Sequence, residues 1–243
     1  MSVRRLWPAI TLVLLASCSA LLPERARPTL PAPPSRSEAP LVGALIDLPI
    51  TRDTRAEVLR DSRELSQCLT QLTTARVTFS PVPDRVTSPT CGLASAGVLG
   101  PDMGTVARMS PGDVRMTCRT ALALSVWRRQ SLEPAAREIL GTDVVQIDHM
   151  GAYACRNVNN GVGSTRISAH SQAAALDFVG VRLRDGRRIS VREDWHGNAP
   201  EARFLRRIRD DACRIFGTVL SPDYNSVHAF HLHLEATDTQ FCR

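Results

Sequence analysis

The sequence predicts an α+β fold, in which a small and mainly antiparallel sheet is flanked by helices. Two apolar segments, residues 176–183 and 188–191, flank the dipeptide Asp185-Gly186, which is a strong signal for a β-hairpin. Residues 198–217 carry apolar side chains at helical spacing, and residues 230–235 alternate between polar and apolar as a half-buried strand does. A hairpin, a helix and a further strand in this order are typical of the α+β class.

The rest of the chain supplies further elements and an ordinary composition. We expect helices over residues 55–72 and 110–130, and short strands at 77–79, from 91 onward and at 144–147. A hydrophobic content of 43% is enough for a packed core. The net charge is +6, and all 30 basic residues are arginine. No arginine-rich tract is interleaved with aromatic residues, so we expect no nucleic-acid partner.

The N-terminus has the pattern of an export signal. Arg4 and Arg5 precede an apolar stretch over residues 6–15, which is too short to remain as a membrane-spanning helix. The sequence Leu15-Ala16-Ser17-Cys18 resembles a bacterial lipoprotein cleavage site, so residues 1–18 are predicted to be a signal peptide that ends at a lipid-modified Cys18. Ser19 follows this cysteine, and a residue other than aspartate at this position favours transport of the lipoprotein to the outer membrane. The alternative is an ordinary secretory signal, which would give a soluble periplasmic protein.

Three segments are predicted after the signal. Residues 19–44 are rich in proline, small and charged residues and should form a disordered tether. Residues 45–110 are expected to be an N-terminal extension packed on the main domain, which spans 111–243. A lipid anchor followed by a tether would hold this domain at the periplasmic face of the outer membrane.

Cysteine usage agrees with export. Six cysteines remain besides Cys18, an even number, and an exported chain enters an oxidising compartment. We therefore expect three disulfides. The pairing of Cys68 with Cys91 is favoured because they flank one short segment, and the other two pairings stay open. The spacing excludes a cysteine-based zinc finger. The six candidates are Cys68, Cys91, Cys118, Cys155, Cys213 and Cys242.

A split metal site is predicted near the C-terminus. His170 and Asp177 lie seven residues apart, and the pair His231-x-His233 follows them. Alternate side chains of a strand share one face, so both histidines of this pair would point away from the apolar core. Asp177 lies in an apolar run, where an unpaired carboxylate is costly to bury. Imidazole and carboxylate donors suit zinc, and catalytic zinc usually has three protein ligands.

These residues resemble the motifs of known families. Ser168-x-His170-x-x-Ala173-x-Ala175-x-Asp177 is similar to the S-x-H-x-x-G-x-A-x-D motif of the D-alanyl-D-alanine carboxypeptidase family of zinc peptidases. The ending His231-x-His233 resembles that of the wider group with the penicillin-insensitive murein endopeptidases and the Hedgehog signalling domain. The whole stretch 118–243 resembles the bacterial extensin-like C-terminal domain, through the segments 151–157, 212–217, 219–225 and 228–233.

The resemblance implies a fold and a set of roles. The fold would be that of the D-alanyl-D-alanine carboxypeptidase and Hedgehog zinc proteins. Zinc would be held by His170, Asp177 and His233. His231 would polarise water or stabilise the oxyanion, and His228 would be a further site residue.

Arg156 occupies the place where relatives have an arginine that steadies substrate or transition-state charge, and Ser168 would support the loop by hydrogen bonding.

Two positions depart from the carboxypeptidase pattern. Ala173 replaces the glycine of the motif, and His228 stands where that branch has its general-base glutamate. A histidine could serve as the base because its pKa lies near neutral. Glu235 is a weaker substitute.

The leading hypothesis is a zinc-dependent peptidase, of carboxypeptidase or endopeptidase type, that hydrolyses amide bonds in the peptides of peptidoglycan. The substrate follows from the resemblance and from export to the compartment that contains the wall, not from the fold. A second hypothesis is a non-catalytic zinc-containing module that binds the wall. A third is a structural domain in which His231 and His233 form a packed polar cluster.

Overall fold

The computed structural model describes residues 43–161 and 164–243, which all belong to one compact unit. The predicted signal peptide with Cys18, and the predicted tether up to residue 42, lie outside the described residues. Within the described part of the chain, no helix has both the length and the apolar character needed to cross a membrane.

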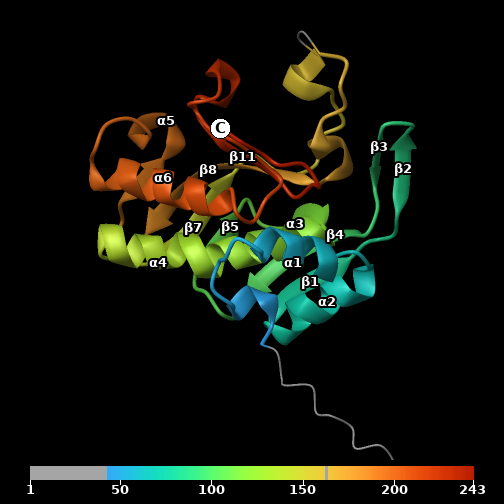
Figure 1. The fold of residues 1–243 in the computed structure, drawn as a ribbon, viewed down its shortest axis with the longest axis horizontal. Coiled ribbons are helices and arrows are strands. Elements are labelled where there is room, and N and C mark those ends of the chain that lie inside the picture. Colours follow the sequence, from blue (N-terminus) through green and yellow to red (C-terminus); the bar gives the residue numbers. More distant parts are fainter. Residues whose placement is uncertain (1–42, 162–163) are drawn as a thin grey trace, which may run out of the picture. The chain divides into compact units, whose positions relative to one another are not determined.

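A seven-stranded sheet forms the centre of the unit (Figure 1). Its strands follow the order β12-β10-β11-β8-β7-β5, and β9 pairs with the C-terminal half of β8. Neighbouring strands are antiparallel except in the β10–β12 and β5–β7 pairs, so the predicted fold class is confirmed. The strands are β5 (Arg108–Ser110), β7 (Val144–His149), β8 (Ala175–Leu183), β9 (Arg188–Ser190), β10 (Thr218–Leu220), β11 (Leu232–Glu235) and β12 (Phe241–Cys242). The predicted hairpin around Asp185-Gly186 is the β8–β9 pair.

Two smaller antiparallel sheets come from the N-terminal half. One has three strands in the order β1-β4-β6, and the other is the β2–β3 hairpin, which extends away from the central sheet (Figure 1). Their strands are β1 (Val77–Pro81), β2 (Arg85–Ser88), β3 (Cys91–Leu93), β4 (Ala96–Asp102) and β6 (Val114–Thr117).

Two predicted helices differ from the observed ones. The helix expected over 55–72 is divided into two, because the chain turns after Asp61. The helix expected from residue 110 begins only at Cys118, where Thr117 Oγ1 accepts the backbone N–H of Thr120 as an N-cap. The helices are α1 (Thr54–Asp61), α2 (Leu65–Thr74), α3 (Cys118–Trp127), α4 (Glu133–Ala135), α5 (Val191–Asp194) and α6 (Pro200–Ala212), and the π-helical segments η2 (Arg128–Leu132) and η3 (Ala136–Leu140) follow α3 and α4. Short 3-10 turns are η1 (Leu45–Asp47), η4 (Val158–Gly161), η5 (Ala169–Gln172) and η6 (Ser226–His228).

The core lies between α3, α6 and the central sheet. Trp127 of α3 meets Phe178 of β8 edge to face with ring centroids 5.2 Å apart, and its indole N–H donates to the carbonyl of Ile208 on α6. Leu232 and Leu234 are fully buried, as their alternation with the histidines predicts. The side chains of β8 and β11 on the face that points away from the core can therefore form a polar site.

Three disulfides are present, as expected, but the favoured pairing of Cys68 with Cys91 is wrong. The bonds are Cys68–Cys118, Cys91–Cys155 and Cys213–Cys242. Cys68 is fully buried on α2, which packs against α3, whereas Cys91 begins strand β3 of the projecting hairpin. Closeness in the sequence was misleading, because β1 and β2 carry the chain away from α2 between the two cysteines.

Candidate metal centre

The pairing of two central strands places Asp177 and His233 side by side. They are direct cross-strand partners in the antiparallel β8–β11 pair. Such partners on one face have their Cβ atoms about 4.5–5.5 Å apart, which lets the two side chains meet. The apolar neighbours Leu176, Phe178, Leu232 and Leu234 point to the core instead. Strand alternation thus puts the carboxylate and one imidazole on the same face.

A 3-10 turn supplies the third side chain. His170 lies on η5, where Ser168 Oγ accepts the backbone N–H of His170 at 3.3 Å. The turn ends at Ala173 in the left-handed region with φ 55°. Glycine adopts this conformation most readily, which explains in physical terms why the related motif has glycine at this position. The turn directs the His170 ring toward β8 and β11.

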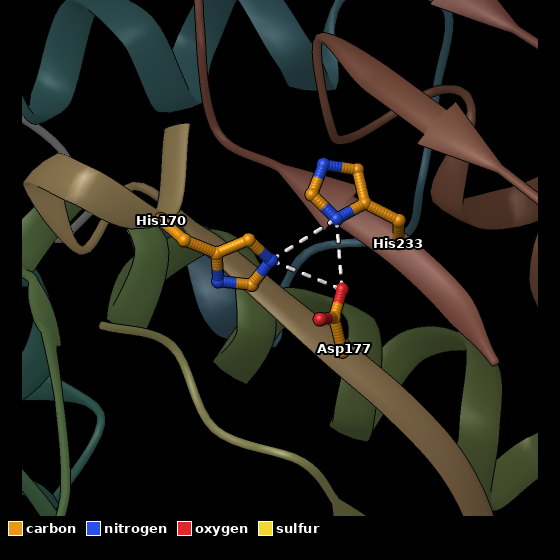
Figure 2. A group of neighbouring side chains, drawn as sticks. All are labelled: His170, Asp177 and His233. Atoms are coloured by element: carbon orange, nitrogen blue, oxygen red, sulfur yellow. Dashed lines mark hydrogen bonds and ion pairs between the residues drawn. The ribbon is translucent and has the colours of Figure 1, made fainter. Parts of the chain in front are cut away.

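The three side chains converge on one point (Figure 2). His170 Nε2 lies 3.1 Å from Asp177 Oδ1 and 3.2 Å from His233 Nδ1. The third side of the triangle, from His233 Nδ1 to Asp177 Oδ1, is 2.8 Å. Donor atoms that surround zinc tetrahedrally at about 2.0–2.1 Å lie roughly 3.3 Å from one another. The donor set and its spacing therefore fit zinc after shifts of a few tenths of an ångström.

The outer nitrogens of both imidazoles are engaged by fixed acceptors. His170 Nδ1 lies 3.0 Å from the carbonyl oxygen of Ala152, and His233 Nε2 lies 2.9 Å from Glu235 Oε1. A carbonyl or an ionised carboxylate can only accept, so each outer nitrogen carries the hydrogen. The facing nitrogens of two neutral rings would then present lone pairs to each other. Such a contact requires a shared cation, either a proton or a metal ion.

The charges of the site also indicate that a cation is held between these side chains. Burial favours the neutral form of Asp177, but the interactions of its carboxylate with His170 and His233 outweigh it and hold the pKa of this carboxyl far below its ordinary value. Burial likewise disfavours charged His233, but its bonds to Asp177 and Glu235 raise its pKa to about 9. Without a metal ion the centre therefore keeps a proton at neutral pH, in the place where a metal ion would lie.

Two further histidines lie beside the triad. His231 Nε2 is 3.6 Å from Asp177 Oδ1, and its buried Nδ1 has no hydrogen-bond partner among the residues that the structure describes. The ring of His228 is 5.0 Å from that of His231, and His228 Nδ1 is held by Asn225 Oδ1 at 2.7 Å. Burial, followed by the neighbouring histidines, lowers the pKa of His228 to about 4. His228 is thus neutral at pH 7, with its Nε2 lone pair available to accept a proton.

Arg156 completes the charged part of the site. Its guanidinium Nη2 lies 3.8 Å from Asp177 Oδ2, on the carboxylate oxygen that does not face the histidines. The side chain is about one-third exposed, so a ligand can reach it. The triad, His228, His231 and Arg156 all line one cleft with a volume of about 820 Å³. The structure therefore brings every residue proposed for metal binding or catalysis to one place.

Sequence reasoning underestimated two groups. Glu235 is only a weak candidate base by its sequence position, but in the structure it is bonded to His233 Nε2 and orients that ring. The alternation of Glu235 with His231 and His233 is the sequence pattern that could have indicated this contact. The Ala152 carbonyl that fixes His170 had no signal, because any residue supplies a backbone oxygen.

We expect Glu235→Gln to lower zinc affinity roughly 10- to 100-fold, because a carboxylate that accepts from a ligand histidine fixes its orientation and increases its basicity. Competition with a chromophoric zinc chelator measures this. Glu193→Gln makes the same chemical change at an exposed position of α5 and should leave the affinity unchanged. Equal affinities for both variants would contradict the orienting role of Glu235.

Fold and site together define a disulfide-bonded α+β protein with a His-Asp-His candidate metal centre in a cleft. Residues 66–243 match the family model described as extensin-like protein C-terminus, so the chain belongs to this family. No curated protein and no solved structure matches the chain.

Proposed function

We propose that the protein is an exported zinc-dependent peptidase that hydrolyses amide bonds in the peptides of peptidoglycan. The observation that carries this proposal is the triangle of His170, Asp177 and His233, whose outer contacts leave their donor atoms directed at one point. The likeness of its motifs to those of the zinc carboxypeptidases and murein endopeptidases supports the choice of metal and substrate.

Zinc in this site would supply Lewis-acid activation of water and of the scissile carbonyl. The chain supplies the remaining groups. Neutral His228 or His231 can accept a proton during attack and return it to the leaving amine, since both line the cleft beside the triad. The guanidinium of Arg156 can stabilise the negative charge that develops on the carbonyl oxygen. Asp177 and Glu235 keep the two imidazoles oriented throughout.

The proposed location is the periplasmic face of the outer membrane, through a lipid on Cys18. Three disulfides are compatible with an oxidising compartment. The predicted proline-rich tether would connect the lipid anchor to the domain.

Digestion of purified sacculi tests the proposal. The zinc-loaded protein should release soluble peptide fragments, and His231→Ala should reduce the rate at least about 100-fold while zinc stays bound, because proton transfer contributes this much. His196→Ala is the matched control, since His196 is exposed and does not line the cleft. If sacculi stay intact with fully zinc-loaded protein, the peptidase proposal is wrong.

One position favours a second candidate, a non-catalytic zinc-containing module that binds the wall. His228 stands where the related carboxypeptidases have glutamate, and its low pKa makes it a weak base. This candidate predicts that the zinc-loaded protein sediments with sacculi and releases nothing from them.

A further inference from the structure

We propose that the cleft contains a sugar-binding subsite, formed by Tyr224 and Phe241, which takes a pyranose ring of the wall glycan beside the metal centre. The identity of the polymer rests on the proposed function. The subsite itself rests on the position, exposure and surroundings of these two rings, and it makes the preferred substrate a peptide still attached to its sugar.

Tyr224 and Phe241 are unusual in their exposure. Of the aromatic residues in the described part of the chain, only these two are exposed, with 43% and 41% of their surface accessible. Their ring centroids lie 5.6 Å apart with the planes at 81°, and both side chains line the cleft that holds the triad. Exposed apolar surface gathered at a cleft marks a place where a ligand binds.

The backbone that carries Phe241 is held in place before any ligand arrives. The Phe241 N–H donates to the carbonyl of Gly217, and β12 pairs with β10. The next residue is joined to α6 through the Cys213–Cys242 disulfide. The carbonyl of Arg243 accepts from both the backbone N–H and the hydroxyl of Ser221. Because this backbone is already fixed, ordering it costs little further conformational entropy when a ligand stacks on Phe241.

The groups around the rings suit a sugar better than an apolar side chain. The guanidinium of Arg243 lies over the Phe241 ring, 5.6 Å from its centroid. The exposed Thr239, whose hydroxyl bonds with those of Thr218 and Thr237, lines the cleft. A pyranose ring has an apolar C–H face and a circumference of hydroxyl groups. It therefore matches an exposed aromatic surface beside the guanidinium donors of Arg243, which a purely apolar group could not pair.

A chain of ring contacts connects the subsite to the proposed chemistry. The Tyr224 ring lies 5.6 Å from that of His228, whose ring lies 5.9 Å from that of His233. Only the His228 ring would thus lie between a sugar on Tyr224 and an amide bound at the metal centre. The cleft volume of about 820 Å³ leaves space for both groups, since pockets of about 300–1,000 Å³ enclose ligands of drug size.

Titration of metal-free protein with N-acetylglucosamine tetramer tests the subsite separately from catalysis. We expect saturable binding that Tyr224→Ala or Phe241→Ala weakens about tenfold or more, as for the loss of a stacked ring. Tyr224→Phe should retain most of the affinity because it keeps the ring. Val106→Ala is the control, since Val106 is exposed and lies outside the cleft.

Two results would overturn the subsite. One is the absence of saturable binding of the tetramer, and the other is equal affinity of the wild type and both alanine variants. Vesicles of phosphatidylglycerol form a second arm of the experiment. If the alanine variants lose vesicle binding and not sugar binding, the rings contact a membrane and the proposal is wrong. Failure of sacculus digestion would leave these measurements intact, because they need no zinc.

Discussion

Asp177→Asn is expected to reduce zinc affinity roughly 100- to 1,000-fold. Four-ligand structural sites bind zinc with about 10–16 kcal/mol, so one ligand accounts for about 2.5–4 kcal/mol. Asparagine keeps the shape of the side chain and removes its charge. Asp177 Oδ1 also contacts both ligand imidazoles, at 3.1 and 2.8 Å, so the substitution replaces a charged acceptor that holds them together with a weaker, neutral one.

Two measurements check this result. Chelator competition gives the affinity, and thermal unfolding with and without zinc gives an independent readout, because a ligand that binds only the folded state raises the unfolding midpoint. The wild type should show this increase, and Asp177→Asn should not.

Asp113→Asn is the matched control for this substitution. Asp113 is exposed and has φ 56°, a conformation that asparagine tolerates well. Zinc affinity in Asp177→Asn within threefold of the wild type would exclude the triad as the metal centre.

Local patterns in the sequence were sufficient for the elements around the site. The turn residues Asp185-Gly186 gave the β8–β9 hairpin, and the alternation along 230–235 correctly assigned the leucines to the core and the histidines to the other face. The start of α3 was missed, because Ser110-Pro111 has the pattern of an N-cap followed by proline at the first helical position. Residues 114–117 instead form the strand β6, which is too short for its alternate burial to stand out in the sequence.

The parts of the site that depend on residue type could be predicted from the sequence. The parts that depend on contacts between distant segments could not. The spacing of histidine and aspartate indicated a metal site, and the resemblance to the zinc-peptidase motifs implied His170, Asp177 and His233 as its ligands. The Tyr224–Phe241 contact depends on the return of β12 to the sheet, and the pairing of Cys91 with Cys155 depends on the projecting hairpin. Both join segments that lie far apart in the sequence, so spacing held no information about them.

The Cys91–Cys155 disulfide connects the β2–β3 hairpin to the loop that serves the metal centre. Cys155 lies between two residues of this loop that matter for the site. Arg156 follows it, and the Ala152 carbonyl, three residues earlier, accepts from His170. The hairpin adds a second contact, in which the Thr87 hydroxyl lies 3.3 Å from that of Tyr153. This disulfide is therefore placed to hold the acceptor that sets the hydrogen position on a ligand histidine.

We expect the double variant Cys91→Ser/Cys155→Ser to lose about 2–5 kcal/mol of folding free energy and, in addition, roughly tenfold in zinc affinity. The first effect is common to disulfides that close long loops, and this one spans 64 residues. The second arises because a mobile loop no longer fixes the Ala152 carbonyl, an outer contact of the kind whose loss costs about 10- to 100-fold. Denaturant unfolding of the metal-free protein measures the first, and chelator competition well below the unfolding midpoint measures the second.

The Cys68–Cys118 disulfide provides the comparison that separates these two effects. It closes a loop of similar length, 50 residues, but it joins α2 to α3 inside the core, where neither cysteine contacts the triad. Cys68→Ser/Cys118→Ser should therefore lose a similar folding free energy and bind zinc as the wild type does while it remains folded. If both double variants lose zinc affinity equally, the loss reflects general loosening of the fold, and the loop at 151–156 has no special role in holding His170.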